Sequence, residues 1–299
     1  GVRAITVDGP AFHDRGANAG WELAGVIAAA TEYLRLLTSA GVTVVDALHQ
    51  ISFRLVADDD QFMTIAKFRA ARQLWGRVAE ALGHPDDGAA VVHAVTSLPM
   101  MTQRDPWVNM LRTTVAVFGA GIGGADTVQV MPFDVAIPGG YPTVSTDFAR
   151  RIARNTQLLL LEESHLGRVL DAAGGSWYVE QLTETLAAQS WSHFQGIEAR
   201  GGFCKARDHI AEQIDQVGDR RAQDIAHRRT AVTGVNEFPN LDERPLPQIP
   251  ASASVQRYAS AFEALRDRSH AYLPRAGARP RLLPPPPGPL AENNTPPPS

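Results

Sequence analysis

A chain of 299 residues, 44% of them hydrophobic, is long enough to bury the core of one large α/β domain or two smaller ones. The net charge is −4 and the Lys and Arg residues are dispersed, which argues against a surface for nucleic acid or for an anionic membrane. A single cysteine, Cys204, excludes an internal disulfide and suits a reducing cytoplasm, and no apolar run approaches the roughly 20 residues of a membrane span.

Strand-like and helix-like segments alternate through the first half of the chain. The strands are expected in RAITVDG (3–9), VTVVDALHQISFRL (42–55), AAVVHAVTS (89–97) and ADTVQVMPF (125–133). Helices are expected after each of them, over about 18–40, 61–82, 105–118 and 146–163. This alternation predicts a parallel sheet built from crossover units. Four units would form either half of an eight-stranded barrel or a small open sheet of the doubly wound type.

The helix boundaries follow from local signals. Asn18 is a suitable N-cap for the first helix, the acidic run 58–60 favours the start of the second, and Asp105 with Pro106 favours the start of the third. The second helix has an apolar stripe with three- and four-residue spacing, formed by Ile65, Phe68, Ala71, Trp75, Val78 and Leu82. Its basic residues lie mostly off this stripe and are expected on a solvated or subunit-facing surface: Lys67, Arg69, Arg72 and Arg77.

The second half of the chain is expected to lie at the periphery of the α/β body. Residues 181–268 are expected to form a helical and extended linker region, with a last helix from Ala251 to Arg268. Residues 269–299 form a Pro-rich tail, and nine prolines in 280–299 predict no regular structure there. Residues 1–180 would then be the α/β body.

Two motifs invite a functional reading that their context does not support. GAGIGG (119–124) has the spacing of a dinucleotide-binding fingerprint, but a helix precedes it and a strand follows, so a helix end and turn is expected. The histidines lack metal-binding spacing. His13 reads as a pocket residue or an exposed loop residue, and His93 as a pocket residue or a hydrogen-bonded core histidine.

Four stretches together resemble the cobalamin-dependent acyl-CoA mutases of the methylmalonyl-CoA mutase family. They are AKFRAARQLW (66–75), DPWVNMLRTT (105–114), TDFARRIARNTQLLLLEES (146–164) and GGSWYVEQLT (174–183). The resemblance implies that residues 1–180 are the back half of a (β/α)8 TIM-type barrel. ARPRLLPPPPGPLAE (278–292) resembles the start of the family's cobalamin-binding domain, with its first strand replaced by prolines.

The resemblance also identifies positions at which functional groups are missing. A Tyr-His pair that contacts cobalamin and substrate in active subunits falls on Pro10 and Ala11, and an arginine for the substrate carboxylate falls on Gln50. A glutamine of the third strand becomes Val95, and an asparagine of the fourth becomes Met131. We therefore expect no catalytic residue and no metal ligand. The residual pocket candidates are His93, Ser52 (which matches a CoA-contacting serine) and Thr127.

This pattern resembles the small, non-catalytic subunit of heterodimeric mutases, truncated. The implied partner is a catalytic large subunit, which holds the acyl-CoA substrate, in a cytoplasmic enzyme that uses adenosylcobalamin. This chain alone is expected not to bind cobalamin, because the family's Asp-x-His-x-x-Gly signature is absent from the sequence. One alternative is a truncated catalytic acyl-CoA mutase of altered substrate specificity. Another is an unrelated doubly wound module.

Overall fold

The sheet is parallel and its strands follow the order of the sequence. A computed structural model describes residues 3–240, 242–243, 246 and 255–272. In this part of the chain the sheet has the order β1-β2-β3-β4, with each strand paired in parallel to the next. The strands are β1 (Ile5–Asp8), β2 (Ile51–Ala57), β3 (Val92–Thr96) and β4 (Thr127–Gln129). The parallel α/β body expected from the alternation is confirmed.

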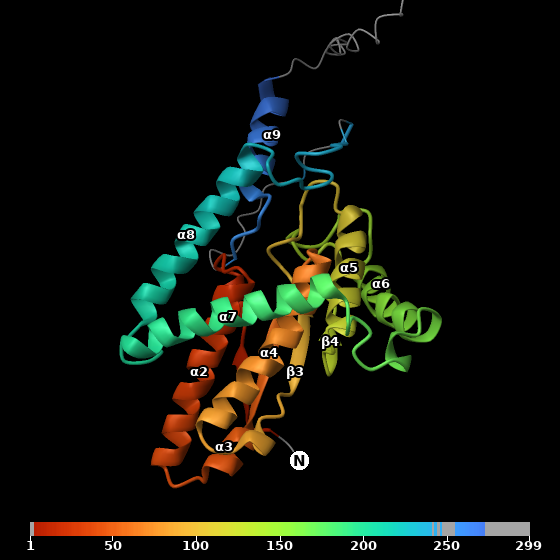
Figure 1. The fold of residues 1–299 in the computed structure, drawn as a ribbon. Coiled ribbons are helices and arrows are strands. Elements are labelled where there is room, and N and C mark those ends of the chain that lie inside the picture. The colour runs from red at the N-terminus through yellow and green to blue at the C-terminus, as the bar shows by residue number, and fades with distance from the viewer. Residues whose placement is uncertain (1–2, 241, 244–245, 247–254, 273–299) are drawn as a thin grey trace, which may run out of the picture.

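Helices cover one face of this sheet in two layers. α2 (Ala19–Ser39), α4 (Gln61–Ala81) and α5 (Val108–Ile122) follow the first three strands. α7 (Trp177–Ala199) crosses the outside of α2 and α4, as Figure 1 shows. The domain boundary expected at residue 180 falls within α7.

The predicted caps and apolar stripe explain why α2 and α4 form where they do. The Asn18 side chain accepts a hydrogen bond from the Trp21 N–H at 3.0 Å, and the Asp60 side chain accepts one from the Met63 N–H at 3.1 Å. Trp75 is fully buried and packs edge-on against Phe53 of β2, with ring centroids 5.0 Å apart. The stripe of α4 is buried as expected, except that Leu82 at its end is exposed.

Three predicted boundaries are wrong. Residues expected as strand form the helix α3 (Val44–Gln50), because Thr43 caps it by accepting a hydrogen bond from the Asp46 N–H at 3.1 Å. α5 begins at Val108 rather than after Asp105, which has a left-handed φ of 45°. Asp105 therefore lacks the extended conformation of an N-cap residue, and the turn at Pro106 and Trp107 is closed by i→i+3 hydrogen bonds, such as that from the Val108 N–H to the Asp105 carbonyl at 3.1 Å. The last helix, α9 (Ser260–Tyr272), begins nine residues later than expected.

Two glycines of GAGIGG, Gly119 and Gly123, allow close packing of α5 against α4. α5 ends at Ile122 and the chain then turns into β4, so the helix-end interpretation is confirmed. A Cβ atom on Gly123 would lie 2.9 Å from the Cβ of Phe68, and one on Gly119 would lie 3.1 Å from Thr64. These two glycines therefore allow α5 to approach α4 closely.

The remaining elements lie around this body. They are α1 (Pro10–His13), α6 (Thr146–Leu158) with a π-helical turn at Leu159–Glu163, short 3₁₀ turns at Pro85–Asp87 and Leu166–Arg168, and α8 (Arg207–Ala226). Within the described ranges, no helix combines the length and apolar character needed to cross a membrane. Most of the expected Pro-rich tail, residues 273–299, lies outside the described residues.

Candidate functional site

A cleft lies at the carboxyl ends of β1 and β2, where parallel α/β proteins place their ligands. It has a volume of about 890 Å³. We call it the carboxyl-end cleft; it is lined by Asp8, Pro10, Ala11, Asp14, Arg15, Arg54, Asp215, Asp219 and Gln256. A smaller adjoining hollow of about 170 Å³ extends along the sheet and includes Val95 and Met131. Four carboxylates and two guanidinium groups thus make the larger cleft strongly polar.

An ion pair on neighbouring strands stands beside this cleft. Arg54 Nε donates to Asp8 Oδ1 at 2.6 Å, and the two residues are direct partners in the register of β1 and β2. The hydrogen bond to Asp8 raises the pKa of Arg54. Both side chains are partly exposed. The sequence offered a signal for them, since each is a charged residue within a strand: Asp8 is the last residue of β1, and Arg54 lies between Phe53 and Leu55 in the middle of β2.

The residual pocket candidates lie on the sheet face that the helices leave uncovered. His93 Nδ1 and Thr127 Oγ1 form a 2.8 Å hydrogen bond between β3 and β4. Val92 and Ala94, the neighbours of His93, are buried on the other face. The Ser52 side chain is buried, and its hydroxyl oxygen lies 2.9 Å from that of Thr6. Ser52 is two residues before Arg54, which pairs with His93 in the register of β2 and β3, so Ser52 and His93 lie on the same face of the sheet. His93 thus has the orientation expected of it, while its role in a pocket stays a prediction.

The five positions at which the family's functional groups are replaced do not all lie together. Pro10 and Ala11 both line the carboxyl-end cleft, and Val95 and Met131 line the adjoining hollow. Gln50 is the last residue of α3, immediately before β2, and therefore lies at the amino end of the sheet. The structure groups four of the five positions and separates Gln50 from them.

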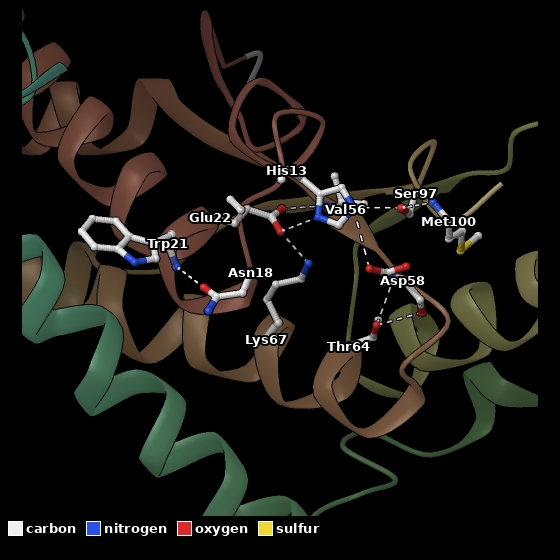
Figure 2. Close-up of polar contacts among 12 residues, drawn as sticks. His13, Asn18, Trp21, Glu22, Val56, Asp58, Thr64, Lys67, Ser97 and Met100 are labelled. Carbon is white, nitrogen blue, oxygen red and sulfur yellow. Dashed lines mark hydrogen bonds and ion pairs between the residues drawn. The ribbon is translucent and has the colours of Figure 1, made fainter. Parts of the chain in front are cut away.

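Behind the cleft, four buried polar or charged side chains pack together with Asp58, whose side chain is 20% exposed. We call this group the buried polar cluster; it comprises His13, Glu22, Asp58, Lys67 and Ser97, and Figure 2 shows His13 between Glu22 and Ser97. Lys67 Nζ donates to Glu22 Oε2 at 2.6 Å, and the Val56 N–H donates to Glu22 Oε1 at 2.8 Å. A Cβ on Gly9 would lie 2.6 Å from Glu22 Oε1, so only glycine fits at this position.

His13 links the cluster to the loops after β2 and β3. Its Nε2 is 2.8 Å from Ser97 Oγ and 3.8 Å from Asp58 Oδ2, and its Nδ1 is 3.7 Å from Glu22 Oε2. Ser97 in turn accepts a hydrogen bond from the Met100 N–H at 3.2 Å. The cluster therefore fixes the loop after β1 against its two neighbours.

The cluster keeps its carboxylates ionised despite burial. Burial would raise the pKa of Glu22, but the Lys67 ammonium and the His13 ring more than offset it and lower that pKa to about 2. Burial would also raise the pKa of Asp58. This effect is outweighed by His13, the Tyr258 hydroxyl and Lys67, so the pKa of Asp58 is lowered as well. Ionised carboxylates at these depths are stable only with such partners.

Two sequence expectations are overturned here. Lys67, expected on a solvated or subunit-facing surface, is buried because Glu22 neutralises it. His13 is neither an exposed loop residue nor part of the cleft lining; it is buried in the cluster. Of the other basic residues of α4, Arg69 pairs with Asp171 and Glu180, Arg72 pairs with Asp126, and Arg77 pairs with Glu80. Among the described residues, no group of three or more His, Cys, Asp or Glu side chains could hold a metal ion.

These observations define a parallel α/β protein with a polar cleft at the carboxyl ends of its strands. The family model of methylmalonyl-CoA mutase matches residues 1–274. The chain therefore belongs to the methylmalonyl-CoA mutase family.

Individual relatives refine this assignment. The chain is 69% identical over 294 residues to the probable methylmalonyl-CoA mutase small subunit of Mycobacterium tuberculosis, covering 98% of this chain and 48% of the relative. It is 41% identical over 277 residues to the methylmalonyl-CoA mutase small subunit of Propionibacterium freudenreichii subsp. shermanii, covering 89% and 43%. It is 34% identical to the methylmalonyl-CoA mutase of Escherichia coli, covering 78% and 33%. The chain thus spans about half the length of the small subunits that it matches.

Proposed function

We propose that this chain is part of the small, non-catalytic subunit of a methylmalonyl-CoA mutase. In this role it supports the radical interconversion of methylmalonyl-CoA and succinyl-CoA, and a catalytic large subunit holds the substrate. The names of the relatives with 69% and 41% identity support the small-subunit reading. They do not favour the alternative of a catalytic mutase with altered substrate specificity.

The observation that carries the proposal is the lining of the carboxyl-end cleft. Pro10 and Ala11 occupy the positions at which active subunits carry Tyr and His, and both face this cleft. Neither side chain can donate or accept a hydrogen bond. The nearby Asp8 and Arg54 neutralise each other, so the arginine is not free to bind a substrate carboxylate.

The uncovered sheet face supports a further part of the proposal, that residues 1–180 form the back half of a barrel. The strands are parallel and sequential, and in the described part of the chain α2, α4 and α5 cover the face opposite to His93. The inner face carries polar side chains such as His93 and Thr127, as expected for the interior of a barrel with a ligand channel. Under this proposal β1 and β4 pair with strands that precede this segment in a full-length subunit.

The methylmalonyl-CoA mutase family uses adenosylcobalamin in its assembled enzymes. The residues of the carboxyl-end cleft do not fit this cofactor, because Pro10 and Ala11 offer no side-chain hydrogen bonds and the lining also includes the carboxylates of Asp215 and Asp219. We therefore propose that the cofactor is bound by the partner and that this chain contributes no group to the chemical step.

The proposal is tested by reconstitution. The purified chain, given adenosylcobalamin and methylmalonyl-CoA, should form no succinyl-CoA, and it should co-purify with a co-expressed catalytic large subunit. In that complex, Ala11→Ser should leave kcat and KM unchanged, because Ala11 contacts no substrate. Turnover by the chain alone, or a loss of turnover in the Ala11→Ser complex, would overturn the non-catalytic assignment.

A further inference from the structure

A segment from the far end of the chain lies on the loops that follow β1, β2 and β3. The Gln256 N–H donates to the Asp14 carbonyl at 2.8 Å, and the Tyr258 N–H donates to the Pro99 carbonyl at 2.9 Å. These contacts join residues that are widely separated in sequence. The segment 255–263 therefore connects loops that the sheet itself does not connect.

Tyr258 is the first anchor of this segment. Its hydroxyl donates to Asp58 Oδ2 at 2.5 Å and lies 3.2 Å from His13 Nε2, so it enters the buried polar cluster. The guanidinium of Arg221, on α8, lies 4.5 Å from the centre of the Tyr258 ring. Arg221 also donates to the Gly16 carbonyl at 3.2 Å. One aromatic side chain thus joins α8 to the loops after β1 and β2.

Glu263 is the second anchor. This buried carboxylate accepts hydrogen bonds from the N–H groups of Gln103 at 2.7 Å and Arg104 at 3.1 Å. Arg257 donates to its other oxygen at 2.7 Å and neutralises it. Glu263 therefore binds the loop after β3, which Tyr258 contacts only through its backbone.

The same segment forms a wall of the carboxyl-end cleft. Gln256 lines the cleft together with Asp14, to which its backbone is bonded. A Cβ atom on Gly16 would lie 3.2 Å from Gln256 Oε1, and one on Gly218 would lie 3.1 Å from it. The two glycines let the segment, α8 and the loop after β1 meet at one point.

We propose that residues 255–263 form a strap, anchored by Tyr258 and Glu263, that holds the loops after β1, β2 and β3 together and sets the width of the carboxyl-end cleft. The sheet positions the amino ends of these loops, and the strap positions their outer parts. A force on the chain beyond the strap would be transmitted to the cleft wall through Tyr258. This inference rests on the fold and is independent of the proposed function.

Amide hydrogen exchange of the full chain tests the strap. Tyr258→Phe removes the hydroxyl and retains the ring, and should speed exchange in 9–17 and 97–101 about tenfold to hundredfold. Glu263→Gln should speed exchange chiefly in 101–105. The matched control is Tyr33→Phe, whose exposed ring lies on α2, and it should change neither region. Unchanged exchange at these loops in both anchor variants would overturn the proposal.

A measurement on the unmodified chain covers the case in which a variant does not fold. If the strap and the loops open together, peptides from 255–263, 9–17 and 97–105 should exchange with the same opening free energy and the same dependence on denaturant. Exchange of the strap at least about tenfold faster than that of the loops would show that they open independently, and would refute the strap.

Discussion

Two ion pairs with the same donor–acceptor distance of 2.6 Å lie on opposite sides of β2. Lys67 and Glu22 are 3% and 0% exposed and lie between the sheet and its helices. Arg54 and Asp8 are 41% and 43% exposed and lie beside the carboxyl-end cleft. Distance alone would rank the two pairs as equal. Burial separates them, because water screens one pair and not the other.

The comparison shows which charges support the fold and which only occupy a surface. The Lys67–Glu22 pair has no solvent to replace a lost partner, so each charge depends on the other. The Arg54–Asp8 pair can exchange its partner for water at little cost. The buried pair is therefore a requirement of the fold, and the exposed pair is a feature of the cleft.

Removal of the lysine should give one of the two largest effects. Lys67→Met leaves the Glu22 carboxylate buried without its ammonium partner, and should cost about 3–5 kcal/mol of unfolding free energy in urea titrations. Arg77→Met is a matched control on the same helix, since Arg77 pairs with Glu80 at 2.6 Å in an exposed position. It should cost no more than about 1 kcal/mol. The double variant Glu22→Gln/Lys67→Met should recover part of the loss; a double variant as unstable as Lys67→Met would contradict this account.

Truncation of a buried apolar side chain on the same helix gives a reference for the loss of unfolding free energy in Lys67→Met. Trp75 is fully buried against Phe53, so Trp75→Ala should cost about 3–5 kcal/mol through lost contacts and a residual cavity. Leu82→Ala, at the exposed end of α4, should cost much less. Equal urea midpoints for Trp75→Ala and the parent chain would show that this face of α4 is not packed as described.

The next largest effect on the unfolding free energy is expected from acid, which protonates Glu22 and so weakens the buried pair. The pKa of Glu22 is lowered to about 2 from 4.5, so its contribution is complete above the unfolded-state pKa and is lost as the pH falls from about 4.5 towards 2. The shift corresponds to about 3 kcal/mol. The unfolding free energy should fall across this window in the parent chain and fall less steeply in Glu22→Gln. Parallel pH profiles for the two proteins would show that Glu22 does not carry the effect.

The smallest effect is expected at the exposed pair. Asp8→Asn should change the unfolding free energy by no more than about 1 kcal/mol, and 0.5 M NaCl should reduce even that difference. Differential scanning calorimetry at two salt concentrations measures both. A loss as large as that of Lys67→Met would remove the distinction between the two pairs.

Local patterns in the sequence predicted most of the body of this fold. The cap at Asn18 and the acidic run 58–60 before α4 depend on neighbouring residues and are confirmed. A strand lies in each of the four expected segments, although part of the second segment is the helix α3, and the stripe of α4 is buried except for Leu82. The helix α3 was missed because its valines favour strand, although Thr43 and Asp46 already formed a capping signal. The start of α5 was misplaced because the Asp-Pro start signal requires an extended conformation at Asp105, whereas Asp105 has a left-handed φ of 45°.

The buried site could not be predicted in the same way. Lys67 and Glu22 are 45 residues apart, and His13 and Ser97 are 84 apart, so nothing near any of them in sequence indicates its partner. A charged residue between buried neighbours is the only local signal, and it does not distinguish burial from exposure. The resemblance identified Pro10 and Ala11 at the cleft but gave no indication of the Asp8–Arg54 pair.

The strap has a consequence for the order in which the chain folds. Each strand pairs with the strand made just before it, so the sheet can assemble step by step during synthesis. The contact between Tyr258 and His13 joins residues that are 245 positions apart, so it closes a very long loop. Until residue 258 has left the ribosome, Asp58 lacks its hydroxyl partner and the outer parts of the loops lack their anchor. The cleft therefore acquires its final shape only after residue 258 has been synthesised, long after the strands that form its floor.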